Sequence, residues 1–323
     1  MKTTVSRSSM LAACLALALA AIPYAAVNAQ NYPVKPVRMV VPFPPGGFSD
    51  LFGRIIGGKM PESWGQPVLV ENRPGAGGSI GTDIVAKSPP DGYALVMGTI
   101  GTHAINATLF SKLPYDPIRD FVAVAFVVEA EGLLVVHPSI PARTVPDLVA
   151  LARWRPGELT VSPGGAGTTS HLASELFRTM TGTRLVHVPY KGNAPAITGL
   201  LSGESSMLFA TLPTVLPQVQ AGRLRGIAVL GNKRSVAVPQ FPTLAEAGLK
   251  GFEVNNWTGI FAAAGTPSAV VTKLNAETNR VMLLPEVQSR LPREGLRHIA
   301  MTPEQFSSFV RAEKDKWAPL VKA

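Results

Sequence analysis

Hydrophobic positions along the chain follow two different periods. Short apolar runs rich in Val and Ile, such as residues 37–43 and 94–99, alternate with segments whose apolar residues recur every three or four positions, such as residues 51–60 and 79–87. The first pattern is typical of buried strands and the second of amphipathic helices. Their alternation predicts βαβ units, and therefore an α/β fold built on mostly parallel sheets flanked by helices.

The alternation of strand and helix patterns occurs twice. The second block starts with a strand pattern at residues 159–162 and a helix pattern at 171–180, and it ends with a strand pattern at 207–210. A segment rich in Pro and Gly follows at residues 239–252. Two blocks predict two sheets in two lobes, and we expect a crossing between the lobes near the Pro- and Gly-rich segment.

The N-terminal segment does not share this pattern. Two basic residues precede an apolar run from Met10 to Ile22, and small residues follow up to Ala29. This order is typical of a secretory signal peptide, and the run is shorter than the roughly 20 apolar residues of a membrane span. We expect residues 1–29 to be a signal peptide that is cleaved after Ala29, which would place the mature protein in the periplasm.

Cysteine content and charge narrow the classes of function. Cys14 is the only cysteine, so a chain cleaved after Ala29 would hold no disulfide, thiolate ligand or cysteine nucleophile. Residues 11–14 match a lipobox, but most of the apolar run follows that cysteine, which disfavours lipidation.

The basic residues that give the chain its net charge of +9 are scattered along the sequence and not gathered in runs. Such a distribution favours attraction of anionic solutes, and we expect no nucleic-acid partner.

Two glycine-rich loops of similar design each follow a predicted strand and open a predicted helix. The first spans residues 42–50 and the second residues 162–171. Glycine lets a backbone approach a ligand closely, and the free N–H groups at the start of a helix favour an anion. Either loop alone could be an ordinary tight turn, but two such loops on two lobes predict that both bind one anionic ligand.

A third loop offers an enzymatic alternative. Residues 72–81 contain Gly77, Ser79 and Gly81 in the spacing of a serine-hydrolase elbow, with Ser79 as the nucleophile. The elbow requires a strand that runs directly into the motif, whereas residues 73–77 intervene here. No acid and histidine stand out as partners for Ser79. A secreted serine hydrolase therefore remains the alternative, and we expect no enzyme.

Nucleotide and metal sites find little support in the sequence. Residues 53–59 have phosphate-loop spacing, but Met60 stands where Ser or Thr is required. The five histidines include no H-E-x-x-H motif and no two that are close in sequence. We therefore expect no cofactor and no metal site.

Several polar and aromatic side chains are candidates for ligand contact. Thr99, Thr102, Thr168 and Thr169 could donate hydroxyl groups to a carboxylate, although threonines are also common in turns. His103 and His171 each follow a turn, and ligand contact and helix-end structure are both open for them. Tyr190 could wall a cleft, with Lys191 beside it either pairing with a ligand or solvated.

Ordered motifs along the chain then indicate a family. They are residues 41–47 with Asp50 and Arg54, residues 72–78, 91–93, 137–139, 171–177, 187–192 and 242–248, and the step from Trp257 to Gly259. With these motifs the sequence resembles the Bug family, the solute-binding receptors of tripartite tricarboxylate transporters, over essentially the whole chain after the signal peptide.

The resemblance implies a Venus-flytrap fold of two α/β lobes. Lobe 1 would hold residues 31–130 plus 252–323, and lobe 2 would hold residues 131–251. Such a receptor captures a small carboxylate between its lobes, works as a monomer and delivers the ligand to the membrane subunits of a transporter. A ligand sensor that docks on a signalling partner remains open. The residues implied in ligand contact are Phe43, Pro44, Gly46, Gly47, Phe48, Thr99, Thr102, His103, Gly165, Gly167, Thr168, Thr169, Tyr190, Ala210 and Thr211.

One departure from the family pattern bears on the ligand. Many relatives carry Asp where this chain has Ala210. An Asp there could face a ligand ammonium group, so its absence indicates an acid without an amine.

Overall fold

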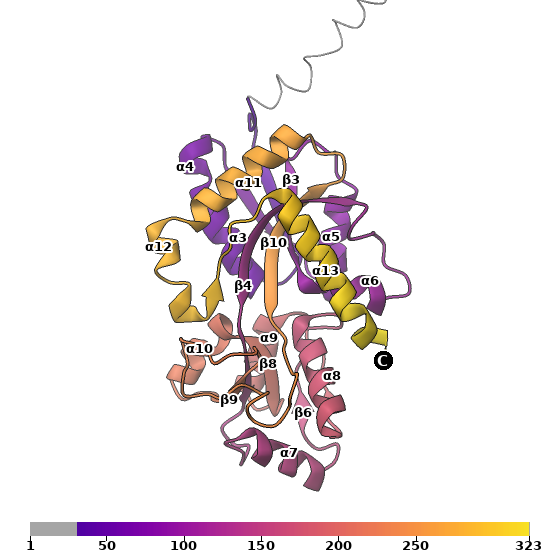
Figure 1. Cartoon of the computed structure of the whole chain (residues 1–323), viewed down its shortest axis with the longest axis vertical. Helices are drawn as coiled ribbons and strands as arrows, with labels where there is room; N and C mark the ends of the chain where they lie inside the picture. Colours follow the sequence, from indigo (N-terminus) through magenta and orange to yellow (C-terminus); the bar gives the residue numbers. More distant parts are fainter. Residues whose placement is uncertain (1–30, 323) are drawn as a thin grey trace, which may run out of the picture.

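The computed structural model describes residues 31–322, and the predicted signal peptide lies outside the described residues. The chain folds into two lobes that follow one another along the long axis of the molecule, as Figure 1 shows. One lobe contains both ends of the described chain, and the other is built from its middle part. Among residues 31–322, none of the helices combines the length and hydropathy needed to span a bilayer.

The first lobe is built on a six-stranded sheet in the order β11-β4-β10-β3-β1-β2. β1 pairs in parallel with β2 and β3, whereas β10 is antiparallel to both β3 and β4, and β11 is antiparallel to β4. The strands are β1 (Val37–Val41), β2 (Val68–Asn72), β3 (Ala94–Thr99), β4 (Phe121–Ala130), β10 (Asn256–Ala263) and β11 (Leu296–Arg297).

The second lobe has a five-stranded sheet in the order β7-β6-β8-β5-β9. β6 is parallel to β7 and β8, and β5 is antiparallel to β8 and β9. The two-lobed α/β prediction is confirmed, but both sheets are mixed where mostly parallel sheets were expected. The strands are β5 (Gly132–Val136), β6 (Thr160–Val161), β7 (Val186–His187), β8 (Met207–Thr211) and β9 (Arg225–Val229).

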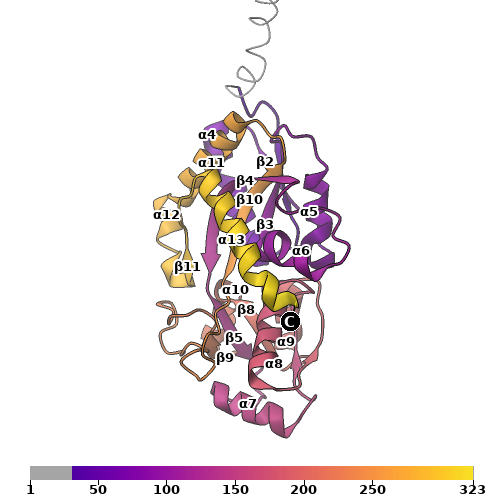
Figure 2. The ribbon, with the colours of Figure 1, turned by 45° about the vertical axis from the view of Figure 1, so that its right-hand side comes forward.

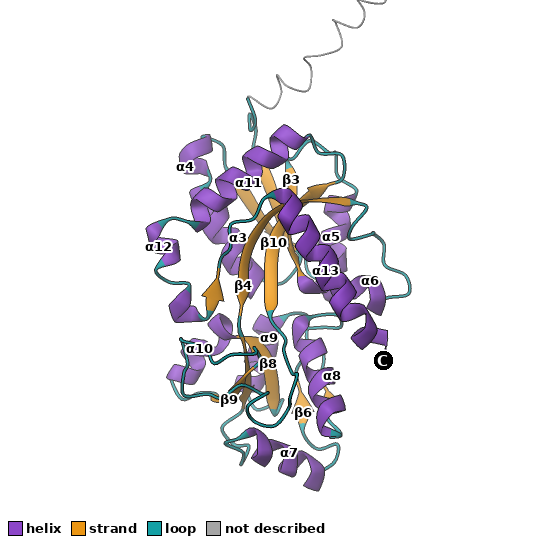
Figure 3. Ribbon diagram, in the orientation of Figure 1, coloured by secondary structure: helices purple, strands orange, loops and turns teal. Residues whose placement is uncertain are grey.

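Helices cover both faces of each sheet, as Figure 3 shows. Figures 1 and 2 also show that α13 runs along the first lobe and ends beside α8 of the second. The first lobe has α3 (Phe48–Lys59), α4 (Pro61–Trp64), α5 (Ser79–Ala86), the turn η2 (Gly101–Ile105), α6 (Asn106–Leu109), α11 (Ser268–Met282), α12 (Pro285–Gln288) and α13 (Pro303–Lys322). The second has α7 (Val145–Trp154), α8 (Thr169–Thr181), α9 (Asn193–Leu201) and α10 (Leu212–Gln220).

The core of the first lobe follows from alternation along β1. Met39 and Val41 pack in one cluster with Phe52 of α3, whereas Val40 packs in another with Phe306 of α13. All five side chains are almost fully buried, and burial of each contributes about 1.5–3 kcal/mol. A strand that is apolar on both faces therefore holds helices on both sides of the sheet.

Two crossings connect the lobes. β4 passes into β5 with Glu131 as the single residue between them, and the chain returns from β9 to β10 through residues 230–255. A hydrogen bond from the Leu230 N–H to the Gly132 carbonyl (2.9 Å) joins the return crossing to the start of β5, and one from the Val254 N–H to the Leu230 carbonyl (2.9 Å) links the two ends of the return crossing. Parallel neighbours in a sheet are joined by a crossover connection, usually through a helix. β10 has no such connection to β3 or β4, because the chain enters it from the other lobe, and it runs antiparallel to both strands.

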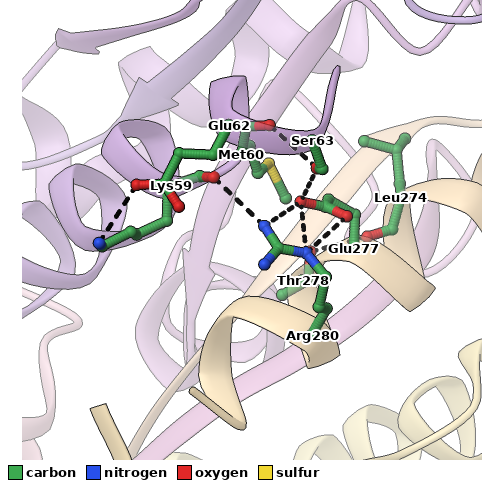
Figure 4. Close-up of polar contacts among 8 residues, drawn as sticks. All are labelled: Lys59, Met60, Glu62, Ser63, Leu274, Glu277, Thr278 and Arg280. Atoms are coloured by element: carbon green, nitrogen blue, oxygen red, sulfur yellow. Dashed lines mark hydrogen bonds and ion pairs between the residues drawn. The ribbon is translucent and has the colours of Figure 1, made fainter. Parts of the chain in front are cut away.

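A polar network fastens α11 to the far end of α3, as Figure 4 shows. Arg280 donates to the buried carboxylate of Glu277 (2.7 Å) and to the backbone carbonyl of Lys59 (3.3 Å). The Ser63 hydroxyl donates to the same carboxylate. These bonds fix the C-terminal end of α3, whose N-terminal end faces the second lobe at the site described next.

Candidate functional site

A cavity of about 60 Å³ lies between the two lobes. None of its 18 lining residues, all of which are in the described part of the chain, has a charged side chain. Nine of the residues expected in ligand contact line it: Phe43, Pro44, Gly47, Phe48, Thr99, Thr168, Thr169, Ala210 and Thr211. Sequence reasoning missed the other nine: Ser49, Gly132, Gly164, Ser170, Asn193, Phe209, Leu230, Val254 and Asn256.

The first glycine loop delivers the N-terminus of α3 to this cavity. Gly47 caps the helix without a side chain, so no cap bond occupies the N–H groups of the first turn. Asp50 fixes the loop: it accepts from the Gly46 N–H (2.9 Å) and from Asn72 (2.9 Å), while Asn72 also donates to the Phe43 carbonyl (2.9 Å). The first-turn N–H groups of α3 are thus held facing the cavity.

The charge state of Asp50 follows from these contacts. Burial by itself would raise the pKa of this carboxyl, but hydrogen bonds from Arg54, the Gly46 N–H and Asn72 outweigh burial and hold the pKa below its usual value. The carboxylate is therefore ionised at neutral pH. It does not line the cavity and acts on the site only through the loop that it orders.

The second glycine loop delivers the N-terminus of α8 from the other lobe. Thr168 caps the helix by accepting from the His171 N–H (3.3 Å), and Thr169 and Ser170 form its first turn against the cavity. The Ser170 hydroxyl is buried, and within the described residues it has no hydrogen-bond partner. A buried hydroxyl without a partner is costly, so Ser170 is a donor available to a ligand.

The lobes touch around the cavity. Thr169 donates to the Asn256 side chain across the cleft (3.0 Å). A Cβ added to Gly101 would lie 2.7 Å from the Gly167 carbonyl oxygen, and one added to Gly77 would lie 2.2 Å from the Ala166 carbonyl oxygen. Glycines of the first lobe therefore allow backbone contact with the second, and the arrangement is closed.

Two expected contact residues lie inside the first lobe. His103 is fully buried, and its ring stacks on Phe261 with centroids 3.7 Å apart. Burial lowers the pKa of His103 to about 3, so the ring is neutral. Thr102 bonds to the Thr99 N–H (2.9 Å) and to the His103 ring (2.8 Å). The turn after β3 thus presents Thr99 to the cavity and turns Thr102 and His103 into the core.

Four more expected residues also lie outside the cavity lining. Gly46, with φ of +80°, shapes the first loop, and Gly167, with φ of +75°, forms the contact with Gly101. Gly165 and Tyr190 line a neighbouring hollow. The Tyr190 hydroxyl donates to Glu204 (2.8 Å), which directs it away from the cavity.

The lining residues that sequence reasoning missed include some that lie inside the two glycine loops and some that lie where the chain crosses between the lobes. Ser49, Gly164 and Ser170 stand within the two glycine loops, each directly next to a residue that was expected in ligand contact, so the same loop signal could have included them. Leu230 and Val254 lie in the return crossing between the lobes and Asn256 begins β10, and their local sequence carries no ligand-binding pattern.

Ser79 does not have the surroundings of a serine-hydrolase nucleophile. Ser79 is buried at the start of α5, and its hydroxyl accepts from the Asn106 side chain at 3.4 Å. Among the described residues, no hydrogen bond joins Ser79 to a histidine. The nucleophile–base contact that hydrolysis requires is thus absent around Ser79.

Two α/β lobes with two crossings, closed on a small cavity at two helix N-termini, define a two-lobed solute-binding protein. A sequence profile described as "Tripartite tricarboxylate transporter family receptor" matches residues 52–323. The chain therefore belongs to the receptors of the tripartite tricarboxylate transporter family, which confirms the predicted family.

Curated relatives support this assignment. The chain is 38% identical over 308 residues to the "UPF0065 protein in tcbD-tcbE intergenic region" of a Pseudomonas species, covering 95% of this chain and 91% of the relative. It is 36% identical over 299 residues to "Protein BugT" of Bordetella pertussis, covering 92% of each chain.

Solved structures agree with the fold. "R. palustris Rpa4515 with adipate" superposes with a TM-score of 0.87 at 37% identity, covering 90% of this chain and 97% of the other. "MatC (Rpa3494) from Rhodopseudomonas palustris with bound malate" superposes with a TM-score of 0.86 at 33% identity, covering 90% and 100%. "Structure of periplasmic binding protein BugD" gives 0.86 at 32% identity, covering 90% and 98%.

Proposed function

We propose that this receptor captures a small carboxylate between its lobes in the periplasm and delivers it to the membrane subunits of a tripartite tricarboxylate transporter. The observation that carries the proposal is that the N-termini of α3 and α8 face one cavity from opposite lobes. Each N-terminus favours negative charge, so a carboxylate that reaches both binds the closed state better than the open one.

The lining of the cavity supports an acid without an amine. None of the 18 described lining residues could balance an ammonium group with a carboxylate, and Ala210 leaves an apolar surface near the end of β8. Hydroxyl groups of Thr99 and Ser170 and backbone N–H groups are suited to carboxylate oxygens. Related receptors solved with adipate and with malate bind acids of this kind.

A thermal-shift screen tests the proposal. The protein from Gln30 onward is heated with short dicarboxylates, hydroxy acids, aromatic carboxylates, amino acids and uncharged sugars. A ligand at 100 times its dissociation constant adds about 2.7 kcal/mol of stability, and we expect such a shift with one class of carboxylate. A shift with sugars alone, or with no compound, would contradict the proposal.

Replacement of Ser170 by alanine separates binding from stability. The variant loses a hydrogen bond to the charged ligand, worth about 1.5–3 kcal/mol, so its affinity should fall about 10- to 150-fold. The ligand-free protein should be as stable as the wild type or more so, because the variant removes an unpaired buried hydroxyl. Calorimetric titration and thermal melting measure the two effects, with the exposed Ser308→Ala as control. Unchanged affinity would remove Ser170 from the site.

The remaining expectations belong to the same proposal. We assign residues 31–130 plus 252–323 to lobe 1 and residues 131–251 to lobe 2, consistent with the strands of each sheet. Export follows from the predicted signal peptide with cleavage after Ala29, and a complete cavity within one chain is consistent with a monomer.

A further inference from the structure

Three metal-binding side chains meet on the second lobe, apart from the ligand cavity. His171 and Glu175 are four residues apart on α8 and share one face of the helix, and β7 brings His187 beside them. One ligand atom from each residue lies within 4.8 Å of the other two. None of the three lines the ligand cavity.

The hydrogen bonds of the cluster determine which nitrogen of His187 is free. The Ser174 hydroxyl donates its single proton to the His171 carbonyl (2.7 Å). Its oxygen must therefore accept from the His187 Nε2–H, at 3.0 Å. In the neutral ring this leaves a lone pair on Nδ1, and Nδ1 lies 3.2 Å from Oε1 of Glu175.

Nδ1 of His187 and Oε1 of Glu175 are two hydrogen-bond acceptors that face each other, and a cation between them would remove their repulsion. With Nε2–H donated to Ser174, the Nδ1 lone pair of the neutral His187 ring faces Oε1 of Glu175 at 3.2 Å. Two acceptors at hydrogen-bond distance repel each other unless a proton or a metal ion lies between them.

Neighbouring side chains hold Glu175 and His187 in place through hydrogen bonds, as residues behind metal ligands usually do. Arg178 holds the other Glu175 oxygen, Oε2, at 2.7 Å, which keeps Oε1 directed at the His187 ring. Ser174 fixes the tautomer of His187 in the manner of a residue behind a metal ligand. The Gly167 N–H contacts Nδ1 of His171 at 3.4 Å, a weak bond that a metal bond readily replaces.

We propose that His171, Glu175 and His187 bind a divalent transition-metal ion of the zinc class. Two imidazoles and one carboxylate are a common ligand set for Zn²⁺, with a water molecule completing the tetrahedron. Mg²⁺ and Ca²⁺ prefer oxygen ligands and should bind weakly. This site was not expected from the sequence, because 15 residues separate the two histidines and only the pairing of β7 with β6 brings them together.

Titration of tag-free, chelator-treated protein with Zn²⁺ tests the site. We expect saturable binding of one ion per chain by calorimetry, and a d–d absorption band with Co²⁺. His171→Ala, Glu175→Gln and His187→Ala should each weaken Zn²⁺ binding at least about tenfold, and Ser174→Ala, which keeps all three ligands, about 10- to 100-fold. The matched control is His137→Ala, which changes a histidine outside the cluster and should bind like the wild type.

Circular dichroism and carboxylate binding report whether each variant is folded. Absence of saturable Zn²⁺ binding to the wild type would overturn the proposal. So would binding that is undiminished in folded Glu175→Gln and His187→Ala, or Mg²⁺ binding as tight as that of Zn²⁺.

Discussion

Replacing Gly101 by alanine will weaken carboxylate binding about 5- to 150-fold while leaving the ligand-free protein nearly as stable as the wild type. Gly101 begins η2 and is not among the glycines with positive φ, so lobe 1 accepts a side chain there without backbone strain. The added Cβ would lie 2.7 Å from the Gly167 carbonyl oxygen of the second lobe. Such overlap costs about 1–3 kcal/mol. It destabilises the closed, ligand-bound state but not the open state, so it weakens ligand binding.

Calorimetric titration with the carboxylate identified in the screen measures the effect on Gly101→Ala. Gly58→Ala is the matched control: Gly58 lies in α3, a Cβ there would have no neighbour within 4 Å, and helix propensity favours alanine by about 1 kcal/mol. This control should bind like the wild type. Wild-type affinity in Gly101→Ala would mean that ligand binding does not require the lobe contact seen here.

Replacing Ala210 by aspartate is expected to lower carboxylate affinity at least about hundredfold. Ala210 is buried and lines the cavity, which has no basic side chain among its described lining residues. A second negative charge would face the ligand without a partner, and an uncompensated buried charge costs about 3–5 kcal/mol. The same change should improve binding of an amino acid, whose ammonium group can pair with the new carboxylate.

Ala210→Asn separates charge from size in this test, because asparagine has nearly the same shape as aspartate without its charge. We expect Ala210→Asn to retain most of the affinity that Ala210→Asp loses, measured by titration with the same carboxylate and with glutamate. Equal losses in the two variants would assign the effect to packing, and no loss in either would place the ligand away from Ala210.

The parts of the site that could be predicted from sequence are those in which one short segment contains the whole signal. Gly47 and Phe48, and Thr168 and Thr169, stand where a glycine loop opens a helix, and all four line the cavity. A loop that leaves helix N–H groups free can bind an anion wherever the fold places it, so these residues were found without knowledge of the fold.

Other parts depend on the direction in which a side chain points. Thr99 and His103 are only four residues apart, but Thr99 reaches the cavity while His103 stacks on Phe261 in the core. The local sequence offers a threonine and a histidine after a strand in either case. Only the packing of β10 against β3 brings Phe261 to the ring.

By itself, the sequence determined the alternation of strands and helices, the two glycine loops and the family, since each depends on residues within a few positions or on ordered motifs. The tertiary structure alone decided that β10 returns antiparallel, that Leu230, Val254 and Asn256 line the same cavity, and that His187 lies beside Glu175. These features join residues from different strands, helices and crossings, and their contacts form only when those elements pack against one another.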